Sequence, residues 1–197
     1  ALRSKYPRAR VLEIDTAAAK ALSGVEAVLT AEDIPGENKI GHLKHDQYSL
    51  IPVGGLTHYL GDAIAVIAAK DRETAEKAKK LIKVKYEVLP HIRTIEEAAA
   101  EDAPKVFDEE ENNICAHKHI RGNADEAIRN SKYVISHHFE TPWTEHAFLE
   151  PECAVALYDE DGDIFVYSTD QSAHQTLHEC SLLLGTDRVK VQNALVG

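Results

Sequence analysis

The chain has 197 residues, of which 44% are hydrophobic, so it is long enough and apolar enough to bury a core. Its 22 basic and 33 acidic residues give a formal net charge of -11, which argues against nucleic acid or an anionic membrane as a partner. We find no apolar run near the roughly 20 residues of a membrane span, and no export signal at the start. These features favour a cytoplasmic enzyme, or enzyme subunit, that acts on a small molecule.

The three cysteines, Cys115, Cys153 and Cys180, are widely spaced and form no Cys-x-x-Cys motif. Their number and spacing disfavour a disulfide, a zinc ribbon or an iron–sulfur cluster within the chain, and we expect small buried thiols instead. The sequence contains no methionine and begins at Ala1. We therefore expect it to be a segment of a longer protein.

Strand and helix signals alternate along the first ninety residues. Residues 10–15 and 25–29 have the apolar pattern of strands, and the alanine-rich residues 16–22 between them predict a short helix. The apolar residues 63–69 suit a buried strand. Asp71 is a suitable N-cap for a helix over residues 72–82. Two favourable i,i+4 ion pairs are expected on that helix: Glu73 with Lys77, and Glu76 with Lys80.

The strand signals continue on both sides of an acidic segment. Residues 83–90 alternate apolar and charged side chains, which predicts a strand with one solvated face. Residues 95–113 are acidic and nearly free of large apolar side chains, as in a connector. Asn123, with Glu126 three residues later, predicts the start of a short helix. The stretch "KYVISHHFE" at residues 132–140 predicts a strand.

A hairpin and a helix are expected near the end of the chain. Asp161-Gly162 lies between two apolar strand-like runs, which is a strong hairpin signal. Ser172 can cap a helix that runs to Leu184, with Gly185 as its stop. Taken together, these elements predict an α/β (α+β) fold.

The segment "YSTDQSAHQTLHEC" places a glutamine and two histidines where a strand gives way to a helix. His174 and His178 lie four residues apart, so they face one side of the predicted helix and could share a metal ion. The His-Glu-x-x-His motif and a third ligand at a telling spacing are absent, which makes the signal weak. A solvated helix face is the preferred interpretation, and we assign no metal ligand.

Two further segments are rich in chemically active or flexible residues. Residues 144–152, "TEHAFLEPE", bring together Glu145, His146, Glu150 and Glu152, and paired carboxylates can carry out acid/base chemistry. From the residues alone, a polar entry to a strand is preferred. Residues 54–62, "GGLTHYLGD", match neither nucleotide-binding glycine pattern, so their glycines predict a tight turn.

Long blocks of the sequence, taken in order, resemble the molybdenum-binding subunit of the xanthine dehydrogenase and aldehyde oxidase family. The blocks are "ALRSKYPRARVLEID", "GVEAVLTAEDIPG", "YLGDAIAVIAAKDRETAEKAKKLIKVKYEVLP" and "GNADEAIRNSKYVISHHFETPWTEHAFLEPECAVA". The resemblance implies an α/β hammerhead domain over residues 1–112. It also implies that residues 113–197 are the beginning of a mixed α+β molybdopterin-binding domain.

The resemblance also implies roles for individual residues. In the family, a glutamine in a turn similar to "STDQ" approaches the molybdenum cofactor, which makes Gln171 the expected cofactor contact. An amide suits this role because it donates a hydrogen bond without adding charge. His146 and Glu150, in the segment that matches the active-site wall, are candidates for shaping the substrate pocket. The family's glycine-rich loop and catalytic glutamate are expected beyond Gly197, so no catalytic residue is assigned within the chain.

The implied activity is that of a molybdenum-dependent oxidoreductase that hydroxylates a purine-like heterocycle with oxygen from water. Nicotinate-type heterocycles, aldehydes and carbon monoxide remain alternative substrates. Iron–sulfur clusters and FAD are expected in other domains or subunits of an oligomer, and the segment alone is expected to be inactive. Two rival functions differ in class: a scaffold subunit without cofactor, and a metal hydrolase built on His174 and His178.

Overall fold

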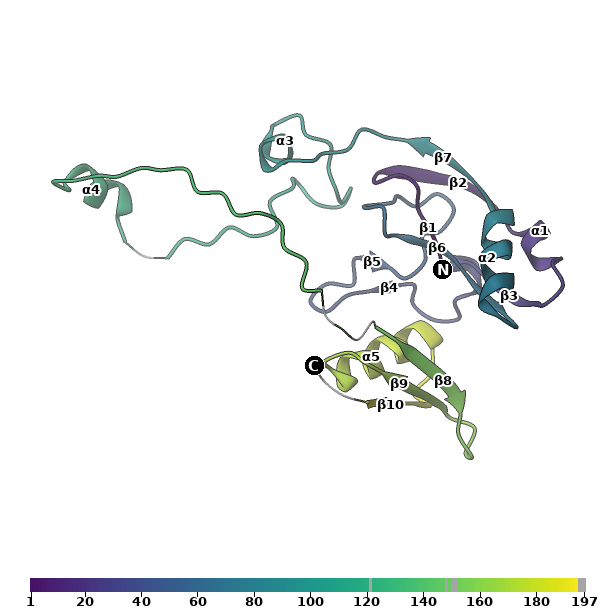
Figure 1. Cartoon of the computed structure of the whole chain (residues 1–197). Coiled ribbons are helices and arrows are strands. Elements are labelled where there is room, and N and C mark those ends of the chain that lie inside the picture. The colour runs from purple at the N-terminus through teal and green to yellow at the C-terminus, as the bar shows by residue number, and fades with distance from the viewer. Residues whose placement is uncertain (121, 148, 150–151, 195–197) are drawn as a thin grey trace. The chain divides into compact units, whose positions relative to one another are not determined.

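The computed structural model describes residues 1–120, 122–147, 149 and 152–194, and the chain divides into two compact units (Figure 1). The first unit combines Ala1–Thr94 with Glu152–Gly197, and the second comprises Ile95–Pro151. Helices occur together with small, mostly antiparallel sheets. This mixture confirms the predicted fold class. The expected domain boundary after residue 112 falls within the second unit and stays a prediction.

Residues 1–94 form three small antiparallel sheets with helices beside them, and the smallest of these sheets is the β4–β5 pair. β6 pairs with β1 on one side and with β3 on the other, whereas β2 pairs with β7. The elements are β1 (Leu2–Arg3), β2 (Ala9–Asp15), α1 (Ala17–Lys20), β3 (Val25–Leu29), the 3-10 turn η1 (Ala31–Asp33), β4 (Lys39–Ile40), β5 (Gln47–Tyr48), β6 (Ala63–Ala69), α2 (Arg72–Leu81) and β7 (Lys83–Val88). The predicted strands at 25–29 and 63–69 are therefore confirmed.

The core of this part of the chain consists of two small apolar clusters. Val11, Ile51 and Ile64 form one cluster. Side chains of α1 and α2 close the other against β3 and β6: Ala19, Val28, Ala65, Ala78 and Ile82. Each fully buried valine or isoleucine contributes about 1.5–3 kcal/mol relative to an exposed one. The helices and strands that were predicted from apolar patterns are thus held together by the side chains that make those patterns.

Helix α2 begins at its predicted cap and carries one of its two predicted ion pairs. Asp71 Oδ1 accepts a hydrogen bond from Thr74 N at 2.7 Å, and Lys77 lies 2.7 Å from Glu73. The second expected pair is not the closest one: Glu76 pairs with Lys79 at 2.6 Å, and Lys80 adds only a weaker electrostatic attraction. Positions i+3 and i+4 are both neighbours on a helix surface, so spacing alone did not decide between the two lysines.

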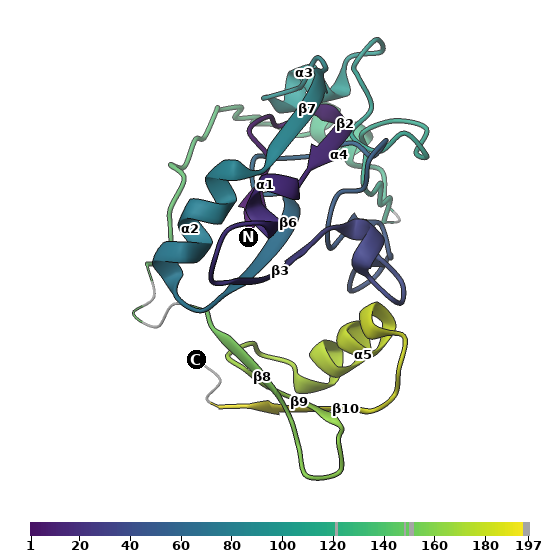
Figure 2. The same cartoon turned by 90° about the vertical axis from the view of Figure 1, so that its right-hand side faces the viewer.

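The C-terminal part of the first unit is a three-stranded sheet with one helix. It comprises β8 (Ala154–Tyr158), β9 (Ile164–Ser168), α5 (Ala173–Leu184) and β10 (Val189–Asn193) in the strand order β10-β9-β8. β8 and β9 form the predicted antiparallel hairpin, whereas β9 and β10 are parallel and connected by α5 (Figure 2). Two parallel strands need such a crossover, because the chain must return to the edge of the sheet where the first strand began, and a tight turn is too short for that.

The end of α5 is joined to residues of the N-terminal part by backbone hydrogen bonds. Gly36 N donates to Leu183 O at 2.9 Å, and Glu37 N donates to Leu182 O at 2.8 Å. The last carbonyl groups of a helix lack partners in a following turn, and Leu183 O gains such a partner in Gly36 N, whereas Leu182 O accepts from Gly185 N at 3.3 Å as well as from Glu37 N. Gly185 ends the helix in the left-handed conformation, with φ of 64°, as predicted.

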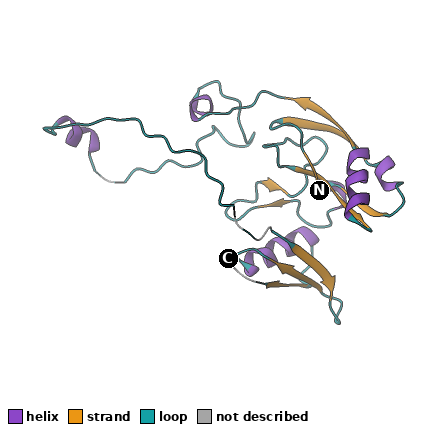
Figure 3. Ribbon diagram, in the orientation of Figure 1, coloured by secondary structure: helices purple, strands orange, loops and turns teal. Residues whose placement is uncertain are grey.

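The second unit contains little regular structure among its described residues (Figure 3). It holds α3 (Ile95–Ala99) and α4 (Ala124–Arg129), and Asn123 caps α4 by accepting from Glu126 N at 3.2 Å. The strand predicted at residues 132–140 is wrong, since no pairing occurs there among the described residues. Tyr133 and Ile135 are exposed. The pattern of a strand is present, but a strand also needs a partner for its backbone groups.

The cysteines depart from the expectation of buried thiols. Cys115 and Cys153 are exposed, and Cys180 is partly buried on α5; all three are free. The prediction fails because Cys115 and Cys153 lie outside the helices and packed strands. In the described part of the chain, none of the helices is long and apolar enough to cross a membrane.

Candidate functional site

The carboxyl ends of β9 and β10 lie at the same edge of their sheet. Ser168, the last residue of β9, is opposite Asn193, the last residue of β10. Residues 169–172 form the turn that leads from β9 into α5. In sheets with parallel strands and crossover helices, ligands bind outside the carboxyl ends of the strands. The turn after β9 is therefore the candidate functional site.

Asp170 organises this turn through its carboxylate. Ser168 Oγ donates to it at 2.6 Å, Ser172 N donates at 2.6 Å, and Thr176 Oγ1 also donates to it. Asn193 Nδ2 donates to the backbone oxygen of Asp170 at 2.7 Å. The hydrogen bonds to its carboxylate lower the pKa of Asp170 below its ordinary value. The bond from Ser168 has the largest effect, and the bond from Thr176 has the next largest. The turn is thus tied to β9, α5 and β10 by one ionised side chain.

Gln171 follows Asp170 and is exposed. Its side chain makes no hydrogen bond with any residue in the described part of the chain. Ser172, the next residue, caps α5 by accepting from Gln175 N at 3.3 Å. Gln171 is therefore the residue directly before the cap at the positive end of a twelve-residue helix. It can donate to, or accept from, a polar group on a bound molecule without bringing charge.

A pocket of about 360 Å³ lies beside the turn. It is lined by Glu152, Cys153, Ala154, Ser168, Thr169 and Asp170. Cys153 N donates to Thr169 Oγ1 at 3.1 Å, which joins the segment before β8 to the end of β9. The pocket therefore combines hydroxyl, thiol and carboxylate groups with the edge of the turn that carries Gln171.

Of the other residues singled out from the sequence, Glu152 lines the pocket beside this turn. His146 is exposed in the second unit and precedes Ala147, whose φ of 51° is a left-handed value that is unusual for a residue with a side chain. Glu150 lies outside the described residues. Any role of His146 and Glu150 in the substrate pocket stays a prediction.

The two histidines of α5, His174 and His178, are exposed. His178 packs against the ring of His45, with 6.0 Å between ring centroids. Among the described residues, no group of three or more His, Cys, Asp or Glu side chains is arranged to hold a metal ion. His174 and His178 therefore have no third metal ligand beside them among the described residues.

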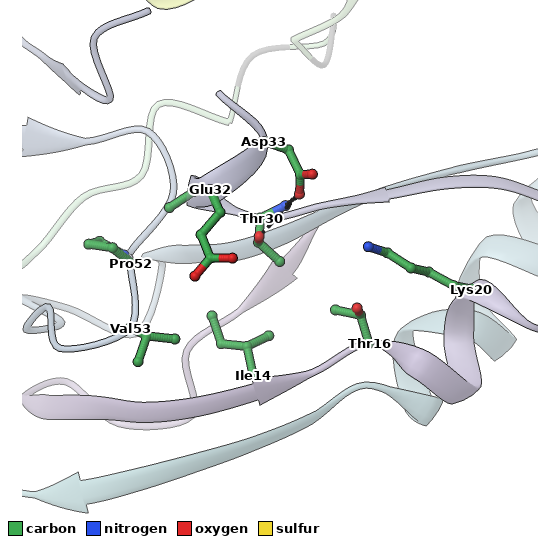
Figure 4. A pocket seen from close by; sticks show the side chains of 9 residues that line it. Ile14, Thr16, Lys20, Thr30, Glu32, Asp33, Pro52 and Val53 are labelled. Atoms are coloured by element: carbon green, nitrogen blue, oxygen red, sulfur yellow. Dashed lines mark hydrogen bonds between the residues drawn. The ribbon is translucent and has the colours of Figure 1, made fainter. Parts of the chain in front are cut away.

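A second pocket, of about 140 Å³, lies in the N-terminal part of the chain (Figure 4). Lys20 extends into it from α1, while Glu32 approaches from η1. Asp33 accepts from Thr30 N at 2.7 Å and from Thr30 Oγ1 at 3.1 Å, so its carboxylate already has partners in the wall of the pocket. The small volume and these internal bonds make this pocket a weaker candidate than the turn after β9.

Basic side chains of β10 and the segment before it bind the acidic β8–β9 hairpin. Lys190 Nζ lies 2.6 Å from Asp159 and 3.1 Å from Asp163, and Arg188 Nε lies 2.7 Å from Asp163. The hydrogen bond with Lys190 is the main reason that the pKa of Asp159 is lowered, and Arg188 has that role for Asp163. The pKa of Lys190 is raised more by its hydrogen bond with Asp159 than by that with Asp163.

This cluster predicts a loss of stability in acid. A carboxylate with a lowered pKa stabilises the folded chain above its unfolded pKa of about 4 and loses that effect as the pH falls through its folded pKa. We therefore expect the midpoint temperature of thermal unfolding to decrease when the pH is lowered below about 4. In a Lys190→Gln variant the midpoint should be lower at pH 6, and its difference from the unmodified chain should narrow between pH 4 and pH 2. A difference that stays constant over this range would contradict the assignment.

Sequence reasoning missed two members of the site, Asp170 and Asn193. Asp170 stands two residues before the helix cap Ser172, a spacing from which an aspartate can accept a hydrogen bond from the backbone of the turn. Asn193 ends β10, a strand that was not predicted although Val189 and Val191 alternate with polar residues. Both signals are local, but only the parallel pairing of β10 with β9 brings Asn193 to Asp170.

Two family models match adjacent parts of the chain. Residues 1–90 match the aldehyde oxidase and xanthine dehydrogenase a/b hammerhead domain. Residues 106–197, which include the whole candidate site, match the molybdopterin cofactor-binding domain.

Relatives of known name match nearly the whole chain but are much longer. The chain is 34% identical to the nicotinate dehydrogenase large molybdopterin subunit of Eubacterium barkeri, over 99% of the chain and 46% of that protein. It is 31% identical to the xanthine dehydrogenase molybdenum-binding subunit of Escherichia coli O157:H7, over 88% of the chain and 24% of that protein. The chain therefore spans less than half the length of these relatives.

Solved structures share the fold over almost the entire chain. The reconstituted CO dehydrogenase of Oligotropha carboxidovorans matches with a TM-score of 0.81 and 28% identity, over 99% of this chain and 26% of that chain. The aldehyde oxidoreductase of Desulfovibrio gigas matches with a TM-score of 0.85 and 23% identity, over 98% of this chain and 22% of that chain.

Proposed function

We propose that this chain, which belongs to the aldehyde oxidase and xanthine dehydrogenase family of oxidoreductases, is part of a molybdenum hydroxylase in which Gln171 contacts the cofactor. Family membership confirms the resemblance noted in the sequence. The observation that carries the role of Gln171 is its exposed amide at the carboxyl end of β9, next to the N-terminus of α5. On this proposal, the glycine-rich loop and the catalytic glutamate of the family lie beyond residue 197.

The residues at the turn fit a molybdopterin cofactor through hydrogen bonding. They offer the neutral Gln171 amide beside a helix N-terminus, where partial positive charge favours an electron-rich group. When bound, the cofactor supplies the redox chemistry, and the protein supplies binding and orientation. On this proposal Gln171 donates a hydrogen bond from Nε2 to the cofactor, while Asp170 and Ser172 hold the backbone on either side of it.

The proposed reaction is hydroxylation of a purine-like heterocycle with oxygen from water. Several relatives with about 30% identity are named xanthine dehydrogenases, which supports the purine class. A nicotinate-type heterocycle is the second candidate, and it is favoured by the 34% identity to a nicotinate dehydrogenase subunit over 99% of the chain. Both substrates are electron-poor aromatic rings, so the same chemistry serves either of them.

Partners are proposed on the same grounds. Electrons removed from the substrate need a path to an acceptor, and we assign that path to iron–sulfur and FAD domains or subunits of an oligomeric assembly. The relative from Eubacterium barkeri is itself named as one subunit of a larger enzyme. The three free cysteines of this chain suit a reducing compartment, in keeping with a cytoplasmic location.

The test is turnover by the assembled enzyme that contains this chain, with metal content measured on the same sample. Xanthine, hypoxanthine, nicotinate and an aromatic aldehyde are supplied in turn with an artificial electron acceptor. We expect molybdenum-loaded enzyme to oxidise the purines. Activity with nicotinate alone would replace the purine assignment but keep the hydroxylase.

Two outcomes would favour the rival functions. An assembly that is supplied with cofactor but never takes up molybdenum would favour a scaffold role. Stoichiometric zinc binding that is lost in a His174→Ala variant would favour a metal hydrolase; we expect no such binding.

A further inference from the structure

We infer that Asp170 is a positioning residue for Gln171, holding the turn after β9 so that the Gln171 side chain leaves the backbone in one direction. This inference rests on the proposed function, because it concerns how the proposed cofactor contact is held. Neither the family match nor the sequence pattern assigns a role to Asp170. Its role follows from the hydrogen bonds that converge on its carboxylate.

The carboxylate joins three elements at the carboxyl edge of the sheet. Its Oδ2 atom accepts from Ser168 Oγ at the end of β9 and from Thr176 Oγ1 in the first turn of α5. Its Oδ1 atom accepts from Ser172 N at 2.6 Å and, more weakly, from Asn193 Nδ2 at 3.4 Å at the end of β10. Both oxygens are therefore used, and each reaches two elements.

An ionised aspartate suits this position for two reasons. A carboxylate is an acceptor at both oxygens, so it can satisfy two hydroxyls and a backbone amide together. Its negative charge also lies near the N-terminus of α5, where it is stabilised by the helix. The converging hydrogen bonds keep the pKa of Asp170 low, so the side chain is ionised at neutral pH.

Gln171 depends on this arrangement because its own side chain has no other support. It is exposed and bonds to no residue in the described part of the chain, so its position is set by its backbone. That backbone is fixed on one side by Asp170 and on the other by the Ser172 cap. When a residue that orients a contacting residue through hydrogen bonds is removed, affinity or activity typically falls by about 10-fold to 100-fold.

The experiment is a double-mutant cycle in the assembled, molybdenum-loaded enzyme. Asp170→Ala, Gln171→Ala and the double variant are compared for kcat, KM, molybdenum content and the electron paramagnetic resonance spectrum of the molybdenum centre. We expect Asp170→Ala to lower kcat by about 10-fold or more with molybdenum retained and the spectrum altered. We expect the double variant to fall no further than Gln171→Ala alone, because both changes remove one interaction.

Two further variants separate positioning from folding. Asp170→Asn keeps an acceptor for Ser172 N and offers an amide to the two hydroxyls, which can rotate to accept, so kcat should recover to within about 3-fold of the unmodified enzyme. Thr176→Val removes one of the bonds and keeps the side chain's shape, so it tests the inference even if Asp170→Ala does not fold. It should lower kcat in the same direction, by less. As a matched control, Asp71→Ala removes an aspartate that caps α2, and it should leave kcat unchanged.

The outcomes distinguish the positioning role of Asp170 from the proposed cofactor contact of Gln171. If Gln171→Ala lowers kcat but Asp170→Ala does not, or if the two losses multiply, the positioning role is wrong and the cofactor contact stands. If Gln171→Ala itself leaves kcat and the spectrum unchanged, the cofactor contact fails, and the positioning role fails with it.

Discussion

Replacing Gln171 with alanine is expected to lower the turnover number of the assembled enzyme by about 10-fold to 100-fold, with molybdenum content unchanged. The change removes one amide donor at the carboxyl end of β9 and leaves the Asp170 hydrogen bonds and the Ser172 cap in place. The fold should therefore be retained, while a bound cofactor loses a neutral hydrogen-bond donor. Steady-state kinetics and metal analysis on the same preparation measure the two quantities.

A second glutamine provides the matched control. Gln175 lies four residues further along, in the first turn of α5, and its Nε2 donates to Glu179 Oε1 at 2.8 Å within the helix. Gln175→Ala removes the same chemical group without touching the turn, so turnover should stay close to that of the unmodified enzyme. Equal losses from the two substitutions would show that the effect comes from α5 in general, which would count against a specific role for Gln171.

The elements that could be predicted are those whose signals are local. Asp71 and Ser172 cap their helices and Gly185 ends α5, because capping depends on side chains within a few residues of the helix end. The Asp161-Gly162 turn forms its hairpin because a glycine tolerates the positive φ of 76° that the turn requires. No distant residue is needed for these outcomes.

The wrong or missing elements are those that depend on partners far away in the sequence. Residues 132–140 have the composition of a strand but no neighbouring strand among the described residues. β10 is short and mostly polar on one face, and it is stabilised by parallel pairing with β9 across the α5 crossover. Local pattern carries no information about either pairing.

The candidate site shows the same division. Gln171 was identified only through the resemblance to a family, since a single exposed glutamine has no distinguishing pattern of its own. Asp170 and Asn193 become recognisable once β9, α5 and β10 are arranged in space, because their hydrogen bonds join residues that are up to 23 positions apart. Sequence reasoning located the turn, and the structure identifies the side chains that hold it.

Substituting Gly36 by alanine is expected to destabilise the first unit by about 2–4 kcal/mol. A Cβ atom at this position would lie 2.0 Å from Leu182 O and 2.6 Å from Gly185 N, both of them backbone atoms. Because backbone at a helix end cannot rotate aside as a flexible side chain can, the two segments must separate. Separation also breaks the bonds from Gly36 and Glu37 to the last carbonyls of α5, at about 1 kcal/mol each. Denaturant unfolding followed by circular dichroism measures the change.

A substitution at Glu37, the next residue, shows whether the loss of stability comes from the backbone contact or from a side chain. Glu37→Ala keeps the amide that donates to Leu182 O and removes only an exposed carboxylate, 3.8 Å from His45. Because exposed ion pairs contribute about 0–1 kcal/mol, this variant should unfold close to the unmodified chain. If Gly36→Ala is equally stable, α5 is not held to the N-terminal part of the chain through its last carbonyls. A large loss for Gly36→Ala alone means that the strand–helix–strand unit carrying Gln171 depends on the N-terminal part for its stability.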